Sequence, residues 1–230
     1  MSRRSKVEIN GFLARHYDLV MDLLFLGNYG RFVRNVIARM QIRQGESILD
    51  LGSGTGRNMC MMVDAVGPTG RVVGVDIGQQ MLEQARRRCR PHPQVAFLKA
   101  RVEEPLPFRQ EFDKVCLFFV VHGFEDDDKE RIFANARKAL KPGGTLWIFD
   151  YAEFALEDLW FPVRWAFTRF ECELALEFVQ SDLKGMLARA GFGQFVSFHF
   201  LCGLLRLAGA RVPPEPQGER QLSCFAGDPS

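Results

Sequence analysis

The sequence predicts an α/β protein with a doubly wound, mostly parallel sheet of seven strands and an antiparallel strand near the C-terminus. Three observations predict this class. Short apolar, β-branched runs alternate with helical patterns between residues 48 and 150. The first run ends in a glycine-rich turn that leads straight into a helical pattern. A length of 230 residues suits one domain with a single core.

The glycine-rich turn follows the apolar run Ile48–Leu51, which we expect to be a buried strand. A helix is predicted from Asn58 to Ala65, and three alternating glycines precede it, Gly52, Gly54 and Gly56. Glycines permit positive φ angles and let a ligand approach the backbone closely. The start of a helix presents free N–H groups and a partial positive charge. The turn is therefore expected to bind an anionic group of a ligand.

Carboxylates before and after the turn narrow the choice of ligand. Asp50 would repel a diphosphate, and Arg57 stands where a dinucleotide fingerprint needs its third glycine. The amino-acid end of S-adenosylmethionine fits better, because its carboxylate can meet the helix start while its ammonium lies near Asp50. A second β-branched run, Arg71–Asp76, ends in a carboxylate that can accept both hydroxyls of a ribose.

These motifs resemble those of a known family. Leu49-Asp-Leu-Gly-Ser-Gly-Thr-Gly56 followed by Val73-Gly-Val-Asp76 is similar to the motifs of class I S-adenosylmethionine-dependent methyltransferases. Further matches are Phe112–Phe119 and Leu140–Asp150, so the resemblance is strong over about residues 45–151. It implies a Rossmann-like fold, S-adenosyl-L-methionine as cofactor, and methyl transfer to a small molecule.

The resemblance also implies which residues bind the cofactor. In the family an acid commonly follows the third strand and hydrogen-bonds the adenine amino group, but Arg101 stands at that position here. The adenine contact is then expected from the backbone of Val102, or from Glu103 if the loop shifts. The complete expected set is Tyr17, Asp50, Gly52, Ser53, Gly54, Asp76, Ile77, Arg101, Val102 and Phe118.

An N-terminal helical lid is predicted over residues 1–40, ahead of an S-adenosylmethionine-binding domain at residues 41–210. Apolar residues recur at helical spacing from Phe12 to Gly30. Tyr17-Asp18 resembles the segment that folds over the cofactor in small-molecule methyltransferases. The alternatives are an amphipathic helix packed on the sheet edge and, because Leu23–Leu26 is strongly apolar, contact with a membrane surface.

The remaining elements follow in order along the chain. Helices are expected at Phe32–Met40, Gly78–Cys89, Asp126–Leu140 and Ser181–Ala190, the last of them capped and stopped by Gly191. Strands are expected at Val95–Ala100, Lys114–Val121, Thr145–Asp150, Phe195–Phe200 and Leu204–Ala208. A turn is expected at Lys141–Gly144, and a loose tail at residues 211–230.

Candidate bases follow the fourth and fifth strands, where a sheet of this kind opens its ligand crevice. His122 is the first choice because an imidazole titrates near neutral pH, and Asp150 and Tyr151 are the others. We expect His122 and Tyr151 to be catalytic; the alternative for His122 is a hydrogen-bonded pocket residue. The other histidines do not cluster with acids or cysteines, so no metal site is predicted.

A helical, aromatic-rich insertion is predicted at residues 151–180, above the carboxyl edge of the sheet. We expect this insertion and the N-terminal lid to enclose a small, largely apolar acceptor. The expected lining residues are Tyr17, Phe154, Trp160, Phe161 and Trp165. A dimer interface and ordinary helix packing are the alternatives, so a monomer or a homodimer is expected.

Composition excludes several other classes of protein. The net charge of +2 gives no argument for nucleic-acid binding. The six cysteines are scattered without a Cys-x-x-Cys pair, which is typical of reduced thiols in a cytoplasmic protein. No uncharged apolar run is long enough to cross a membrane, and no secretory signal is recognised at the N-terminus.

The acceptor is less constrained than the cofactor. Tyr17-Asp18 and Asp182–Phe192 resemble the quinone C-methyltransferases of ubiquinone and menaquinone synthesis, which tend to carry an Arg-Asn pair where this chain has His122-Gly123. A quinone-like or lipid-like acceptor is expected, with phospholipid N-methylation, or arsenite methylation through Cys172 and Cys224, as alternatives. A regulatory protein that kept the cofactor fold is a further alternative, against which the intact glycine motif argues.

Overall fold

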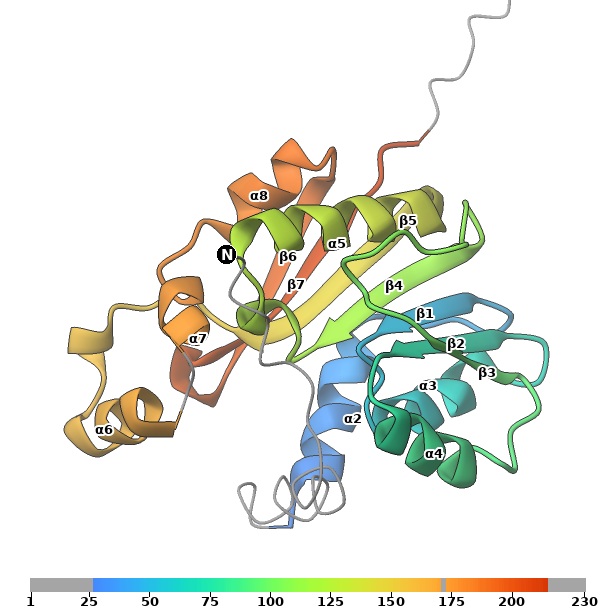
Figure 1. The fold of residues 1–230 in the computed structure, drawn as a ribbon, viewed down its shortest axis with the longest axis horizontal. Coiled ribbons are helices and arrows are strands. Elements are labelled where there is room, and N and C mark those ends of the chain that lie inside the picture. Colours follow the sequence, from blue (N-terminus) through green and yellow to red (C-terminus); the bar gives the residue numbers. More distant parts are fainter. Residues whose placement is uncertain (1–26, 171–172, 215–230) are drawn as a thin grey trace, which may run out of the picture.

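The computed structural model describes residues 27–170 and 173–214, and its centre is a seven-stranded sheet (Figure 1). The strands lie in the order β3-β2-β1-β4-β5-β7-β6. Among the strands of the described residues, β7 alone runs in the direction opposite to the other six, so the predicted sheet is confirmed. The strands are β1 (Ser47–Leu51), β2 (Arg71–Asp76), β3 (Val95–Lys99), β4 (Phe112–Phe118), β5 (Leu140–Tyr151), β6 (Gly193–Phe200) and β7 (Leu205–Arg211).

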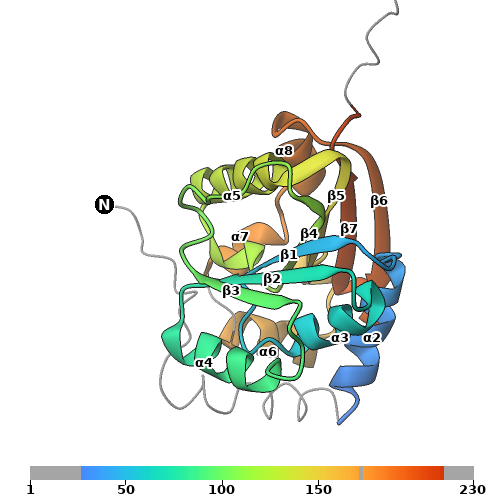
Figure 2. The ribbon, with the colours of Figure 1, turned by 90° about the vertical axis from the view of Figure 1, so that its right-hand side faces the viewer.

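Helices cover both faces of the sheet (Figure 2). On one face lie α2 (Tyr29–Arg39), α3 (Arg57–Val66) and α4 (Gln79–Arg88), and on the other lie α5 (Asp126–Ala139) and α8 (Leu183–Arg189). The helix α6 (Phe161–Phe170) stands away from the sheet, and α7 (Glu173–Phe178) leads back toward it (Figure 1). Three short 3-10 helices complete the described chain: Val121–Gly123, Leu156–Asp158 and Leu201–Gly203.

Two hydrophobic layers hold the sheet between its helices. Successive side chains of a strand point to opposite faces. In β1, Ile48 therefore packs in the layer completed by α2 and α3, whereas Leu49 and Leu51 pack in the layer completed by α5 and α8. Because both faces are covered, the central strands read as continuous apolar runs, which is how the sequence identified them.

Charges and caps explain where several helices begin and end. Three acids open α5, Asp126, Asp127 and Asp128, and three arginines close α4, Arg86, Arg87 and Arg88. Both placements complement the helix dipole. The helix α8 is capped by Asp182, whose carboxylate accepts the N–H of Gly185 at 2.8 Å, rather than by Ser181 at the start of the expected range.

Several strands differ from the sequence prediction at their ends. The strand β7 continues to Arg211, beyond the expected Ala208 and into the first residue of the predicted loose tail, and β4 and β5 differ for reasons that the structure shows. The strand β4 stops at Phe118 rather than Val121, because Phe119 has a φ of 56° and turns the chain into the 3-10 helix that carries His122. The strand β5 begins at Leu140, so the turn expected at Lys141–Gly144 lies inside it. Its pairing with β4 shifts register there, between Phe112 and Lys114.

In the two described ranges, no helix has the length and apolar character needed to cross a bilayer.

Candidate active site

The glycine turn lies between β1 and α3, and each of its glycines has a different surrounding. All three have positive φ: 82° at Gly52, 53° at Gly54 and 73° at Gly56. A Cβ on Gly52 would lie 2.4 Å from Val120 Cγ2, and one on Gly56 would lie 2.9 Å from Ala85 Cβ. A Cβ on Gly54 would meet nothing within 4 Å. The outer glycines thus allow the chain to pack, and the middle one leaves its backbone open to a ligand.

Asp76, at the end of β2, holds the middle of this turn. One carboxylate oxygen accepts the N–H of Gly54 at 2.8 Å, and the other accepts the N–H of Gly78 at 2.7 Å. An ionised carboxylate offers about four acceptor positions, and this carboxylate is the one expected to accept the ribose hydroxyls. The structure therefore gives Asp76 a second role that the sequence did not predict, which is to orient the turn itself.

Asp50 is buried beneath the turn, with 1% of its surface exposed. Burial raises the pKa of Asp50 to about 7; a hydrogen bond from Cys116 opposes this rise and the charge of Asp76 adds to it. The Cys116 thiol lies 3.6 Å from the carboxylate. An ammonium group beside Asp50 would stabilise its ionised form, so the site suits a cationic ligand group.

Two buried oxygens at the turn have no hydrogen-bond partner: the Ser53 hydroxyl and the side-chain carbonyl of Asn58. Buried polar atoms of this kind are rare in folded proteins and indicate a missing ligand or water. Ser53 was predicted as a binding residue and Asn58 was not. The sequence feature that could have identified Asn58 as a binding residue is its place in the first turn of α3, next to a ligand bound at the helix start.

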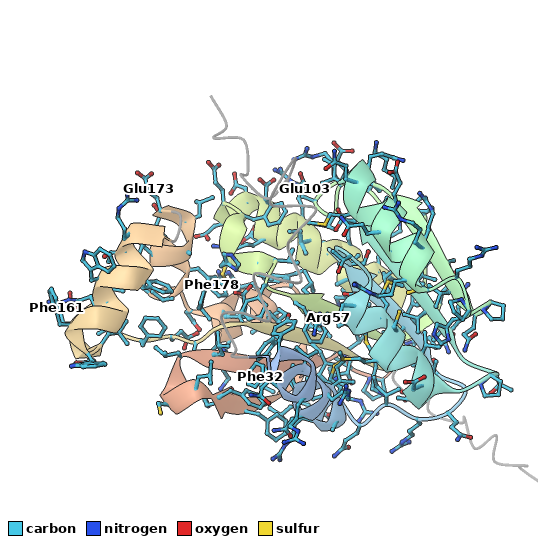
Figure 3. All side chains as sticks on the ribbon, turned by 90° about the horizontal axis from the view of Figure 1, so that it is seen from below. Phe32, Arg57, Glu103, Phe161, Glu173 and Phe178 are labelled. Carbon is cyan, nitrogen blue, oxygen red and sulfur yellow. The ribbon has the colours of Figure 1, made fainter. Side chains whose placement is uncertain are left out.

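Arg57, which replaces the third glycine of a dinucleotide fingerprint, packs against α2. Its guanidinium lies 4.9 Å from the centre of the Tyr29 ring. The side chain therefore connects the start of α3 to the start of α2 at the edge of the glycine turn. Figure 3 labels Arg57.

The ends of β4 and β5 bring His122 and Asp150 together. The Nδ1 atom of His122 lies 2.7 Å from one Asp150 oxygen, and the His122 backbone N–H donates to the other at 3.2 Å. The N–H of Tyr151 also donates to Asp150, at 2.9 Å. With 1% of its surface exposed, Asp150 is fixed by three donors. A proton on Nδ1 makes Nε2 the basic nitrogen of His122, the arrangement of a base with its orienting acid.

Aromatic rings surround this pair. The His122 ring is 5.2 Å from the Tyr151 ring, and Tyr151 is 4.9 Å from Phe167 of α6. Phe119 and Phe154 extend the cluster on either side, at 6.2 Å from Tyr151 and 5.5 Å from Phe167. The two expected catalytic residues therefore lie side by side among aromatic side chains.

The residues expected near adenine lie in the loop after β3. Arg101 pairs with Glu103 at 2.5 Å, and the backbone carbonyl of Val102 accepts a bond from Asn135 at 2.9 Å. Ile77 is half-buried between Asp76 and Gly78, and Phe118 is buried at the end of β4. The assignment of adenine to Val102 or Glu103 stays a prediction.

The aromatic insertion divides into an inward and an outward part. Phe154 and Phe167 face the His122 cluster, but Trp160, Phe161 and Trp165 expose 76%, 66% and 55% of their surface. The helix α6 stands off the sheet (Figure 1), and the place of these three residues in the acceptor pocket stays a prediction. Tyr17 and the rest of residues 1–26 lie outside the described residues.

With the site in view, comparisons with known proteins identify the family. Residues 48–144 match the methyltransferase domain family. The chain is 30% identical over 211 residues to a ubiquinone/menaquinone biosynthesis C-methyltransferase of Xanthomonas campestris, and the match covers 81% of each protein. This chain belongs to the class I S-adenosylmethionine-dependent methyltransferases.

Other relatives agree with this assignment. A protein of the same name from Proteus mirabilis is 32% identical over 151 residues, which cover 64% of this methyltransferase and 59% of the relative. That match thus spans less than two thirds of the relative's length. A solved S-adenosylmethionine-dependent methyltransferase from Aquifex aeolicus, 18% identical, has a TM-score of 0.58 and covers 78% of this chain and 89% of its own. This likeness confirms the fold.

S-adenosylmethionine is therefore the cofactor of this methyltransferase, and the residues present fit it. The Ser53 hydroxyl would donate to its carboxylate, and the Asn58 carbonyl and the Asp50 carboxylate would accept from its ammonium. Gly54 leaves space beside the turn for these groups, while its own N–H is donated to Asp76. Asp76 is the acid that would accept the ribose hydroxyls.

Proposed function

We propose that this methyltransferase moves the methyl group of S-adenosylmethionine to a ring carbon of a small, largely apolar, quinone-like acceptor. Two observations support the proposal. Two relatives that match this chain over more than four fifths of its length are named as ubiquinone/menaquinone biosynthesis C-methyltransferases. Aromatic rings also line the region around His122, where they can stack on a flat apolar ring.

His122 is the proposed base, and its pairing with Asp150 carries this proposal. The cofactor supplies a methyl group that is already activated, so the protein must position the acceptor and remove a proton. A ring hydroxyl of a reduced quinone would donate its proton to Nε2 of His122, which makes the neighbouring ring carbon a better nucleophile. Asp150 would hold the tautomer and stabilise the imidazolium that forms.

Tyr151 is proposed to position the acceptor rather than to carry its proton. Its ring lies between His122 and Phe167, and its backbone N–H is already bonded to Asp150. Closure of this aromatic region around the acceptor would also keep water from the sulfonium. The alternatives of phospholipid N-methylation and arsenite methylation remain untested; the two cysteines named for arsenite, Cys172 and Cys224, lie outside the described residues.

The test is a methyltransferase assay with a reduced, short-chain hydroxyquinone as acceptor. We expect a product heavier by one methylene, with the new methyl on a ring carbon by NMR. His122→Ala should lower kcat by about 10²–10⁴-fold with little change in cofactor affinity. Methylation at oxygen, or turnover only with an amine-bearing lipid, would contradict the proposed acceptor.

A further inference from the structure

Two cysteines that are far apart in the sequence meet directly behind the glycine turn. Cys60 lies in the second turn of α3 and Cys89 follows the last residue of α4. Their sulfur atoms are 2.8 Å apart, close to the bonded separation of about 2.0 Å in a disulfide. This pair could not be recognised in the sequence, because disulfide and metal patterns are recognised by short spacings.

The surroundings give the two sulfurs different chemistry. The hydrogen bond from Cys89 lowers the pKa of the Cys60 thiol against the opposing effect of burial, and the charge of Arg88 lowers it further. The same contact raises the pKa of Cys89, as does its burial. Cys60 is half-buried and Cys89 is buried, so Cys60 is the sulfur that ionises more readily and is also the more accessible one.

We propose that Cys60 and Cys89 are an oxidation site at which a hydroperoxide forms a reversible disulfide. The Cys60 thiolate attacks the peroxide oxygen, gains a hydroxyl as sulfenic acid, and releases water or alcohol after protonation. The Cys89 sulfur then displaces that hydroxyl as water and closes the S–S bond. The pair loses two electrons and two protons, and the peroxide is reduced by the same two electrons.

The position of the pair links its oxidation to cofactor binding. The Cys89 thiol lies 3.7 Å from the carbonyl of Gly56, and the neighbouring Arg88 donates to the carbonyl and hydroxyl of Thr55 at 2.9 and 2.8 Å. The end of α4 therefore holds the second half of the glycine turn. Disulfide formation removes the Cys89 proton and draws α3 and α4 together at this point. We expect the oxidised protein to bind S-adenosylmethionine more weakly, and bound cofactor to oppose oxidation by the same factor.

The other described cysteines serve as controls. Cys202 is exposed in the 3-10 helix between β6 and β7, away from other described thiols. Cys116 is unsuitable because its thiol contacts Asp50 in the cofactor site. Cys202→Ser is therefore the matched control, because it removes an accessible thiol that has no described partner sulfur.

The first experiment treats the full-length protein with hydrogen peroxide, blocks remaining thiols and maps disulfides by mass spectrometry. We expect a mass loss of two hydrogens, a linked Cys60–Cys89 peptide pair, and reversal by dithiothreitol. Cys60→Ser and Cys89→Ser should each abolish the link, whereas Cys202→Ser should retain it. Cys60 and Cys89 that stay fully alkylatable after peroxide, or a link through another cysteine, would overturn the proposal.

The second experiment measures cofactor affinity by calorimetry before and after oxidation. We expect the dissociation constant to rise about tenfold in the oxidised protein and to return with dithiothreitol. Cys89→Ala, checked for folding by its thermal transition, should show no response to peroxide. A disulfide that forms without changing the dissociation constant would overturn the link to the cofactor while leaving the oxidation site in place.

Discussion

At the scale of single residues, the pairing of His122 with Asp150 is the feature that most affects the proposed chemistry. The sequence placed both residues after neighbouring strands and offered them as alternative bases. It could not show that one orients the other, because this depends on the turn at Phe119 that brings His122 back over the end of β5. The motif residues Asp50, Gly54 and Asp76 were predictable because their roles are set within a short stretch of chain.

Asp150→Asn should disable the base while leaving cofactor binding intact. An amide has one acceptor oxygen, so it cannot accept all three bonds that Asp150 now accepts, and its NH₂ favours the wrong His122 tautomer. We expect kcat to fall by about 10²–10⁴-fold and the pH–rate profile to lose its acidic limb, the rise in rate that follows deprotonation of the base. Unchanged turnover in a variant with a normal thermal transition would refute the positioning role.

Asp50 should make stability depend on pH. Its pKa is about 7 in the folded protein and 3.8 for an ordinary aspartate, so the folded state holds an extra proton between these limits. The free energy of unfolding therefore falls as pH rises from about 4 to about 7 and then levels off. Asp50→Asn has no such titration. Between about pH 4 and about pH 7, the free energy of unfolding of Asp50→Asn should therefore rise relative to that of the wild type by a few kcal/mol, as urea titrations can measure.

Cofactor binding should release a proton at Asp50. An ammonium placed beside the carboxylate favours its ionised form. Near pH 6, calorimetric enthalpies measured in buffers of different ionisation heat should therefore show proton release by the wild type and none by Asp50→Asn. Equal enthalpies in all buffers for the wild type would place the ammonium elsewhere.

At the scale of elements, the junction of β1, the glycine turn and α3 depends on steric contacts that its motif does not reveal. Gly52 lies against Val120, the residue that follows the positive-φ turn after β4. The type and order of these elements were predicted correctly from the sequence. It misplaced the end of β4 and the start of β5, because both boundaries depend on the pairing of those two strands.

Gly52→Ala should mainly lower stability, whereas Gly54→Ala should mainly weaken cofactor binding. At Gly52 the methyl meets Val120 as well as a positive φ, so we expect a loss of about 2–4 kcal/mol in stability. Val120→Ala should recover part of that loss in the double variant. Gly54→Ala costs only the backbone strain, about 1–2 kcal/mol, but its methyl occupies the ligand space and should weaken cofactor binding at least tenfold. Equal stability of the two single variants would contradict this division.

At the scale of the whole molecule, α6 is the part that the sequence described least well. Its aromatic residues suggested a covered pocket, but amphipathic pattern alone does not say which face of an inserted helix meets the sheet. Figure 3 shows Phe161 at the outer edge of the molecule and Phe178 nearer its centre. The exposed aromatic side chains support the earlier alternative of a dimer interface, which stays a proposal.

Substitutions on α6 and α7 should separate exposed from buried aromatics. Trp160→Ser should change the free energy of unfolding by less than about 0.5 kcal/mol, because its side chain is mostly in solvent. Phe178→Ala should cost about 3–5 kcal/mol, because Phe178 is buried and packs on Lys129. Denaturant titration measures both. A large loss in Trp160→Ser would show that α6 packs against a second copy or another segment in solution.

The insertion of β7 between β5 and β6 has a consequence for biosynthesis. Strands β3, β2, β1, β4 and β5 are complete once Tyr151 has been made. The second neighbour of β5 in the sheet, β7, begins only at Leu205. At translation rates of about 5–20 residues per second, the apolar stretch Trp147–Phe149 waits for seconds as an open strand edge on the nascent chain. A ribosome that stalls in this interval would release a chain prone to aggregate, so slow codons between the two strands should lower the yield of folded enzyme.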